Sequence, residues 1–556
     1  MIYRSLLILL FFLINGAKNY GQELNSNNSI FNELARRDAL LSDEVDQINS
    51  FSLRPFPFNV DSVVNNSEPV RLDPIPVFSV NKFNSNRPYG WGDFGLTSSV
   101  GIQNYISSGL TAKLYLFNID FQPEFIYVQN KSYFGFPDDF PEIVNQDRFL
   151  FYNHGDYPEL FGEGPFYRFW WGQSKITFSL GPIETGLSTK SIWWGPGQWN
   201  SLTFSNNSQS FPHLTMKTAT PINTFVGEFQ SQLLLGRLND SGFAPTQHDE
   251  LNNKYFRNFS GDWRYLNALL ISYSPKWIPG LSVGFTRTFQ QYNENRDNSF
   301  RSIFPIFEAF QKKKFFENGN SVAYDNLAMD QQATVFGRFM SQKAKGEIYF
   351  EYGRRDHAYN FKEAILNPEH ARAFIFGFKK LFTVPGIEDY FLQFRGEITQ
   401  QQQSINRIMR YFGAGGGSTW HTHYQVRGFA NYGQALGVGI GTGSNIQSFE
   451  VGLVDKFDKI GLLFERLENH QDFFYRSLYS SEENKPWVDL SIGFLFDKRW
   501  DQFLLSSKVQ LINGRNYQWQ LDPNSTPEFP KGKHLFSVHS QVSLIYLFQK
   551  NQQLNP

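Results

Sequence analysis

The residues best suited to binding chemistry gather in a tryptophan-rich segment in the first half of the chain. Trp193, Trp194 and Trp199 flank a Gly-Pro-Gly turn, and Asn206 and Asn207 follow it. Glycine and proline bend and stiffen a loop, so the turn would present these rings in a fixed direction. Aromatic faces stack on the C–H surface of sugar rings, and amides pair with sugar hydroxyls. The segment is therefore a candidate sugar-binding loop.

These rings have a second interpretation, in which they only pack a loop into the mouth of the fold. The two interpretations differ in the effect of Trp194→Ala. A ring that stacks on a sugar contributes about 1 kcal/mol beyond its buried area, so its loss would weaken retention of a polymer and leave folding intact. A packed ring would support folding instead, and its loss would cause no separate binding defect.

A glycine-rich segment over residues 433–445 is the second unusual feature. Alternating glycines strip one face of a strand of side chains, so that another backbone can approach closely or a wall can bend. The spacing is not the G-x-G-x-x-G of dinucleotide-binding sites, and no helical pattern follows it. We therefore expect a structural role for these glycines.

Two histidines, His421 and His423, have the spacing of one strand face, where imidazoles could ligate a metal ion. The spacing indicates no third ligand, so we interpret both as histidines of a surface loop. The absence of cysteine excludes disulfides, thiolate metal sites and lipidation through cysteine. The chain also lacks G-x-S-x-G, Walker and H-E-x-x-H motifs. We expect neither catalysis nor a cofactor.

The composition indicates which elements position these residues. Aromatic residues make up 17% of the 556 residues and charged residues only 19%, yet the mean hydropathy is −0.40. Beyond the N-terminus, no apolar run approaches the ~18 residues that mark a membrane-spanning helix. These properties agree when apolar and polar residues alternate along strands, as they do in a transmembrane β-barrel.

The alternation is clear over residues 485–497, where Ile492 and Phe494 share one face and Asp489 and Ser491 share the other. A soluble β-sandwich would also alternate, but with more charge outside and shorter strands. The acidic residues expected on the lumenal face include Glu347, Glu351, Glu397 and Asp489. Polar barrel interiors usually carry such groups, so they do not indicate acid–base catalysis.

Eighteen strands are predicted, an even number that suits a barrel with both termini in the periplasm. They lie near residues 92–105, 108–129, 167–180, 183–191, 213–220, 222–238, 264–275, 280–290, 331–340, 344–354, 371–380, 388–399, 424–440, 446–455, 458–468, 485–497, 500–512 and 533–548. Long and short connections should alternate around the barrel. They fail to do so between residues 400 and 446, so at least one boundary there is wrong.

Four regions are predicted along the chain. They are a signal peptide over residues 1–22, an N-terminal periplasmic helix and extended segment over 23–87, the β-barrel over 88–548, and a C-terminal tail over 549–556. The first region has a basic residue, about ten apolar residues and then small or polar ones, which is typical of a secretory signal peptide. In the second, apolar residues recur at helical spacing from Ser29 to Ile48, and several prolines follow.

The two unusual segments together resemble signature blocks of the Wzi family of capsule-assembly outer-membrane proteins, in the form that Bacteroidetes-type bacteria carry. The matching stretches are SIWWGPGQWNSLTFSNN with FPHLTMKT, and GFANYGQALGVGIGTGSN, within a resemblance over about residues 88–548. It implies an eighteen-stranded barrel, occluded by loops and associated with periplasmic helices, that binds surface polysaccharide without catalysis. The positions carried over as ligand-binding candidates are Trp193, Trp194, Gly195, Pro196, Trp199, Asn206, Asn207, Gln434, Gly437, Gly441 and Asn445.

Two hypotheses of function follow. The first is a non-enzymatic outer-membrane barrel that binds capsular or other surface polysaccharide and supports its attachment or assembly. The second is an outer-membrane pore or exporter for a small solute or polymer. Seven long predicted loops favour a closed lumen and so the first hypothesis. We expect outer-membrane lipid as a further partner, a monomeric state, and no binding of nucleic acid, because the net charge is only −1.

Overall fold

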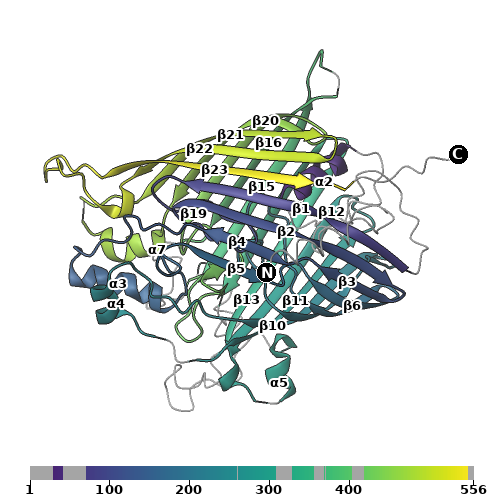
Figure 1. Ribbon diagram of the computed structural model, residues 1–556, viewed down its shortest axis with the longest axis horizontal. Coiled ribbons are helices and arrows are strands. Elements are labelled where there is room, and N and C mark those ends of the chain that lie inside the picture. Colours follow the sequence, from purple (N-terminus) through teal and green to yellow (C-terminus); the bar gives the residue numbers. More distant parts are fainter. Residues whose placement is uncertain are drawn as a thin grey trace, which may run out of the picture.

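Strands that pair edge to edge around a complete circle form the body of the protein in a computed structural model (Figure 1). The structure describes residues 29–41, 70–258, 261–297, 299–307, 329–355, 369, 371–387, 389–403, 419–481 and 483–548. Strand β1 pairs with strand β23 in antiparallel register, and this pairing closes the barrel. Within these residues, no helix has the length and apolar character needed to cross a membrane.

The strands of the wall alternate in direction from one neighbour to the next. They are β1 (Val70–Asn84), β2 (Gly101–Leu114), β3 (Phe117–Phe121), β4 (Glu124–Val128), β5 (Phe166–Trp170), β6 (Lys175–Leu180), β7 (Ile183–Ser188), β8 (His213–Thr218), β9 (Ile222–Asn223), β10 (Gly227–Leu238), β11 (Arg264–Pro275), β12 (Leu281–Tyr292), β13 (Asp330–Ser341), β14 (Gly346–Arg355), β15 (Arg372–Thr383), β16 (Phe391–Gln400), β19 (Asn445–Asp455), β20 (Asp458–Glu468), β21 (Val488–Trp500), β22 (Phe503–Arg515) and β23 (His534–Tyr546).

Three pairs of these segments each form one interrupted strand. Segments β3 and β4 both lie along β2, β5 and β6 lie along the strand made by β3 and β4, and β8 and β9 lie along β10. The barrel therefore has 18 strands, as predicted.

Side chains alternate between the outside and the lumen along each wall strand. In β21, Ile492 and Phe494 are 45% and 48% exposed on the outside, whereas Asp489 and Ser491 are buried on the inside. An apolar outer face and a polar inner face are what a lipid bilayer requires of a barrel. The arrangement confirms the predicted transmembrane β-barrel and excludes the sandwich.

The start of the barrel corrects two predicted boundaries. The wall begins at Val70, not at residue 88, because β1 pairs with both β2 and β23. The strand predicted over residues 92–105 begins only at Gly101. Prolines in β1 hid it from the sequence pattern, since proline cannot donate a ladder hydrogen bond. The structure accommodates Pro74 and Pro76 next to a register shift between Ile75 and Phe78.

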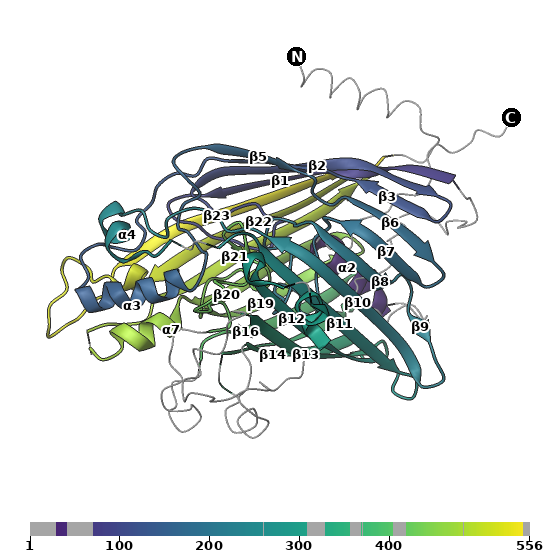
Figure 2. The ribbon, with the colours of Figure 1, turned by 90° about the horizontal axis from the view of Figure 1, so that it is seen from below.

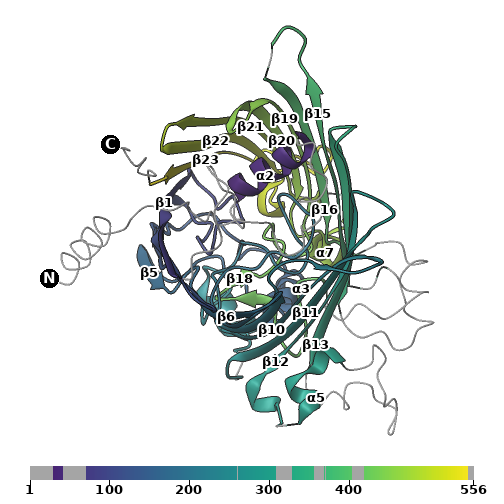
Figure 3. The same cartoon turned by 90° about the vertical axis from the view of Figure 1, so that its right-hand side faces the viewer.

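The strand predicted over residues 424–440 is wrong. In the structure this part of the chain lies inside the barrel and contains the short hairpin of β17 (Ala430–Asn431) and β18 (Gln434–Ala435). Figure 3 shows β18 within the ring of wall strands. Residues 401–444 are thus one connection between β16 and β19. With β1 added and this strand removed, long and short connections alternate around the barrel.

Long connections gather at one end of the barrel, the long-loop end, and short turns gather at the other, the short-turn end. Outer-membrane barrels place short turns in the periplasm and long loops outside the cell. Figure 2 shows α3, α4 and α7 together at the long-loop end. The helices of the loops are α3 (Glu142–Asn153), α4 (Asp249–Tyr255), η2 (Asn293–Asn295), α5 (Phe300–Ile303), η3 (Pro305–Phe307), α7 (Gln471–Phe473), η5 (Phe474–Leu478) and η6 (Tyr517–Trp519).

The N-terminal helix α2 (Ser29–Leu41) lies inside the barrel toward the short-turn end (Figure 2). Its Arg36 forms an ion pair of 2.8 Å with Glu347 on β14. Its Glu33 forms ion pairs of 2.9 Å with Lys459 on β20 and 3.2 Å with Arg395 on β16. The predicted helix is confirmed over residues 29–41. The predicted signal peptide, the segment 42–69 and the tail 549–556 lie outside the described residues.

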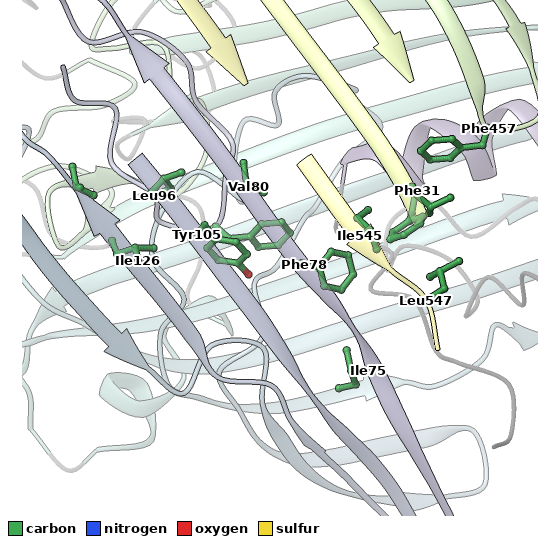
Figure 4. Close-up of a cluster of buried hydrophobic side chains, with 13 residues drawn as sticks. Phe31, Ile75, Phe78, Val80, Leu96, Tyr105, Ile126, Phe457, Ile545 and Leu547 are labelled. Atoms are coloured by element: carbon green, nitrogen blue, oxygen red, sulfur yellow. The ribbon is translucent and has the colours of Figure 1, made fainter. Parts of the chain in front are cut away.

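An apolar cluster fixes the other face of α2 to the seam of the barrel. Phe31 packs edge to face against Phe78 of β1, with 6.0 Å between the ring centroids, and Ile545 of β23 belongs to the same cluster (Figure 4). Burial of these side chains favours the docked helix by the hydrophobic effect. Helix α2 is therefore held by charge on one side and by apolar contact on the other.

The occupied lumen predicts very low ion conductance. Helix α2 and the β17–β18 hairpin both lie within the ring of strands (Figure 3). We expect purified barrel in planar bilayers to give negligible current, with an open porin in the same bilayers as the control. Steady open-channel currents of porin size would contradict a closed lumen.

Candidate functional site

The tryptophan segment forms no exposed stacking platform. Trp194 is 1% exposed and Trp193 is 4% exposed. The indole Nε1 of Trp194 donates a hydrogen bond of 3.0 Å to Gln232 on β10. Its ring meets Phe204 edge to face, with 4.9 Å between the centroids. The hypothesis that these rings stack on sugar at the barrel mouth is therefore wrong for Trp193 and Trp194, because neither ring is accessible.

Two carboxylates of the wall hold this segment in the lumen. Glu351 accepts hydrogen bonds of 2.9 Å from the backbone N–H groups of Gly197 and Leu202. Glu397 accepts bonds of 2.6 Å from Gln198 N–H and 3.0 Å from Asn200 N–H. A loop inside a barrel has no strand partner for its backbone, so side chains must satisfy its N–H groups. These lumenal acids are anchors for the loop.

Glycine is required at the turn of this segment. Gly195 has a φ of 117°, and a Cβ atom there would collide with the carboxylate of Glu351. Its neighbour Pro196 accepts a hydrogen bond of 2.6 Å at its carbonyl from Arg36 of α2. The turn therefore connects the wall to the N-terminal helix. Trp199 is half-buried, with the guanidinium of Arg395 4.5 Å above its ring.

The glycine-rich segment docks directly onto the tryptophan segment. The Ser205 N–H donates to the Leu436 carbonyl at 2.7 Å. The Asn207 side-chain amide donates to the Ala435 carbonyl at 3.0 Å. A Cβ atom at Gly437 would collide with the Leu202 carbonyl, so glycine permits this close approach. The structural role expected for the glycines is confirmed.

The remaining carried-over residues also act within this packing. Asn206 is 1% exposed, and its carbonyl accepts a hydrogen bond of 2.6 Å from Phe94 N–H. Asn445, at the start of β19, accepts bonds of 3.1 Å from the N–H groups of Gln401 and Gln402. Both asparagines thus position backbone segments rather than face open space.

A cavity of about 270 Å³ lies among the loops at the long-loop end. Of the carried-over residues, Asn207, Gln434 and Gly441 line it, and the others do not. Its aromatic lining consists mainly of tyrosines and tryptophans from four loops. These are Tyr89, Trp91, Tyr133, Tyr152, Tyr157, Trp487 and Tyr517. The cavity thus has the ring-rich surface that we expected of the tryptophan segment.

These rings were missed because they are spread over loops that are distant in the sequence. Tyr89 and Trp91 follow β1, Tyr152 lies on α3, Trp487 precedes β21 and Tyr517 lies on η6. A signal was present in the recurrence of tyrosine and tryptophan inside the long connections. That signal became a site only when the closed barrel brought the loops to one end.

Several polar groups in the cavity wall have an atom with no hydrogen-bond partner among the described residues. Arg87 donates from Nη1 to Asp489 at 2.8 Å and from Nε to Ser537 at 3.1 Å, but its Nη2 has no partner. The Nε of Arg148 is also unpartnered, and no carboxylate of the described residues lies within 4.0 Å of this guanidinium. Buried polar atoms in proteins usually have partners, so each such atom calls for an explanation.

Two acceptors complete this set. The His421 Nε2 lies 3.0 Å from the Val438 carbonyl, which can only accept, so Nε2 carries the proton and Nδ1 is a free acceptor. The Nδ1 atom has no partner among the described residues, and neither does Oε1 of Gln518. Both side chains line the cavity. Four side chains that line the cavity beside its aromatic rings thus each have one buried polar atom, two donors and two acceptors in all, with no hydrogen-bond partner among the described residues.

The histidines are not surface residues, which corrects our interpretation of them. His421 and His423 are 3% and 1% exposed. Burial, together with the positive charge of Arg355, lowers the pKa of His421 to about 3. The imidazole is therefore neutral at physiological pH. Among the described residues, no group of three or more His, Cys, Asp or Glu side chains is arranged to hold a metal ion.

Because Trp194 is buried, its replacement by alanine should lower the stability of the folded barrel. The cavity left by a ring that is 1% exposed costs about 3–5 kcal/mol in typical cores. We expect a lower midpoint of heat-induced unfolding in gel mobility assays. Trp277, 65% exposed at a short turn between β11 and β12, offers a matched control, and Trp277→Ala should leave the midpoint unchanged. Normal stability of Trp194→Ala would show that the segment does not support the barrel.

Acid should loosen the loops around His421. The pKa of this side chain is about 3 in the fold against 6.5 in the unfolded chain, so the folded state binds fewer protons between these values. Stability is therefore lost as pH falls below 6.5, by about 1.4 kcal/mol per unit from this group. Hydrogen exchange of residues 434–442 should show more frequent opening at pH 5 than at pH 7. His421→Gln should reduce this difference, and an equal difference in both proteins would contradict the assignment.

The comparisons with known proteins agree with the fold. A family model described as capsule assembly protein Wzi matches residues 104–511, which is more than half of the chain. No curated protein matches the sequence. Among solved structures, the chain is similar to Wzi of Escherichia coli, with 12% identity and a TM-score of 0.57 over 95% of this chain and 100% of that one. That protein is described as an outer-membrane protein involved in group 1 capsule assembly and as a carbohydrate-binding β-barrel.

Two further structures are less similar. OccAB2 of Acinetobacter baumannii has 6% identity and a TM-score of 0.38 over 85% of this chain and 97% of its own. OccK8 of Pseudomonas aeruginosa has 8% identity and a TM-score of 0.39 over 86% of this chain and 97% of its own. The match of the family model over residues 104–511 decides the assignment. The chain belongs to the Wzi family of capsule assembly proteins.

Proposed function

We propose that the cavity at the long-loop end binds a stretch of surface polysaccharide, and that the barrel thereby supports attachment or assembly of this polymer at the cell surface. The observation that carries the proposal is the combination of aromatic rings with unpartnered donors and acceptors in one cavity. Sugar hydroxyls both donate and accept hydrogen bonds, and sugar faces stack on rings. The family assignment supports the same function.

Each part of the cavity has a role in this proposal. Arg87 Nη2 and Arg148 Nε donate to sugar oxygens, and His421 Nδ1 accepts from a hydroxyl. Trp91, which is half-buried, offers a ring face. Asn207, Gln434 and Gly441 contribute as part of the lining. Trp193 and Trp194 do not touch the polymer and act only by packing the segment on which the glycine-rich segment lies.

Binding without catalysis is the second part of the proposal. The cavity contains two carboxylates, and glycoside hydrolysis requires a pair of them that can reach the sugar. Asp489 accepts hydrogen bonds from Arg87 and from the indole of Trp487 at 2.8 Å. Glu159 accepts from Phe136 N–H at 2.8 Å, and burial raises its pKa. Both acids are engaged in holding the loops, and neither is placed as a free nucleophile.

A pore is the weaker candidate. The lumen contains α2 and the tryptophan segment, which are joined to each other by the bond from Arg36 to the Pro196 carbonyl. The wall anchors both through buried carboxylates, Glu347 for the helix and Glu351 for the loop. A solute would have to break these contacts to pass. The barrel therefore acts as a closed scaffold for the loops, and we further propose that it does so as a monomer.

Substitution of Trp91 tests the proposed function. We expect Trp91→Ala to weaken binding of purified surface polysaccharide by about fivefold, which corresponds to the ~1 kcal/mol of one stacked ring. Cells that carry this variant should also retain less polymer. Heat-modifiable gel mobility should stay normal, because the ring is not part of the strand ladder.

Trp277→Ala removes an exposed ring at the opposite end of the barrel and should leave polymer binding unchanged. Equal binding of polysaccharide by Trp91→Ala and by the native protein would count against the cavity as the binding site. Turnover of glycan by the purified protein would contradict binding without catalysis.

A further inference from the structure

The outer face of the wall carries a polar patch where a membrane-spanning barrel should be apolar. On β11, β12 and β13 the outward positions toward the short-turn end are apolar and exposed, as Ile271, Val283 and Val335 show at 43%, 38% and 46%. Farther along the same outward rows, toward the long-loop end, lie polar residues that are almost fully buried. These are Asn267 at 0%, Arg287 at 3%, Gln291 at 2% and Gln331 at 4%.

The register places the patch on the outside and not in the lumen. Arg287 is opposite Leu269 and Ala333 on the two neighbouring strands, two residues from the exposed Ile271 and Val335 in each case. Side chains two residues apart lie on the same face of a strand. The adjacent Thr286 points inward, where it contacts Thr203 of the lumenal loop at 3.0 Å.

A short segment of the β12–β13 connection, formed by α5 and η3, covers this patch. Arg287 donates from Nη1 to the Ile306 carbonyl at 2.7 Å. The Ile306 N–H in turn donates to Asn267 Oδ1 at 3.3 Å. The Tyr265 hydroxyl donates to the Ile303 carbonyl at 2.6 Å. Figure 3 shows α5 outside the ring of strands, next to β12 and β13.

The cap presents aromatic rings on its own outer surface. Phe300 and Phe307 are 67% and 63% exposed. Their rings are stacked with 6.3 Å between the centroids, and Phe304 lies 5.2 Å from Phe300. A run of exposed phenylalanines would be unfavourable in water. The polar side of the cap faces the wall, and its apolar side faces away from the protein.

We propose that the cap formed by residues 300–307 lies against the wall within the outer leaflet of the membrane, with Phe300 and Phe307 in contact with lipid acyl chains. An arginine on the lipid face of a barrel is destabilising toward the middle of the membrane, and the cap removes Arg287 from lipid. The phenylalanines then replace the covered strands as the apolar surface. They continue the exposed belt of Ile271, Val283 and Val335, which the barrel fold itself assigns to lipid.

The absence of cysteine from the chain makes a direct test possible. A nitroxide label is attached to Phe307→Cys in the full-length protein, reconstituted in vesicles of phosphatidylethanolamine and phosphatidylglycerol. Collision of the label with oxygen, which concentrates in lipid, is compared with collision with a water-soluble nickel chelate. Val335→Cys serves as the lipid-facing control. Phe529→Cys, 80% exposed in the β22–β23 loop, serves as the water-facing control.

We expect the Phe307 label to match Val335, with at least a tenfold preference for oxygen over the chelate relative to Phe529. A second label at Phe300→Cys should agree, and heat-modifiable mobility reports that each variant is folded. Access of the chelate at the level of Phe529 would overturn the proposal, because the cap would then face water. Protection from both reagents would overturn it as well, because a protein partner or a second copy would then cover the rings.

Discussion

Hydrogen bonds from lumenal backbone to buried wall carboxylates are the interaction on which the rest of the structure depends. Glu351 and Glu397 stand on neighbouring parts of the wall, and each binds N–H groups of the tryptophan segment. A segment that enters a barrel leaves the strand ladder and loses its backbone partners. Without these acids, the unsatisfied amides would favour a loop that moves out to water, and the lumen would lose one of the segments that fill it.

The fixed loop then serves as a base for the other lumenal segments. The glycine-rich segment lies on it through the contacts of Ser205 and Asn207, and α2 reaches it through Arg36. The cavity at the long-loop end is lined on one side by the glycine-rich segment and on the others by the long loops between wall strands. The lining of the cavity therefore depends on a tryptophan segment whose own rings Trp193 and Trp194 are inaccessible.

The wall shows the same principle on its outer face. A transmembrane barrel must present an apolar exterior, yet β11 to β13 carry Asn267, Arg287 and Gln331 in outward rows. The structure reconciles the two by folding α5 and η3 back onto the wall, where Arg287 donates to the Ile306 carbonyl and Asn267 accepts from the Ile306 N–H. Satisfied polar groups thus hold segments against both faces of the wall, the loop inside and the cap outside.

The sequence by itself determined the class of fold, because a period of two along strands such as β21 is a local property of neighbouring residues. It also determined the helix that starts at Ser29 and the structural role of Gly437. It could not place β1, because Pro74 and Pro76 argue against a strand. Only the pairing of β1 with β2 shows the register shift that lies beside them. Strand pairing is likewise what excludes residues 424–440 from the wall. They alternate like a strand, but in the folded barrel they have no wall partner.

Only the tertiary structure decided where the candidate site lies. The rings at Trp91, Tyr152 and Tyr517 are separated by long stretches of chain and meet because barrel closure brings alternate connections to one end. Trp194 has the residue type for stacking on sugar, but its burial depends on Phe204, Gln232 and the surrounding wall. Residue type and spacing state which chemistry is possible, whereas accessibility is a property of the packed whole, and no linear motif contains it.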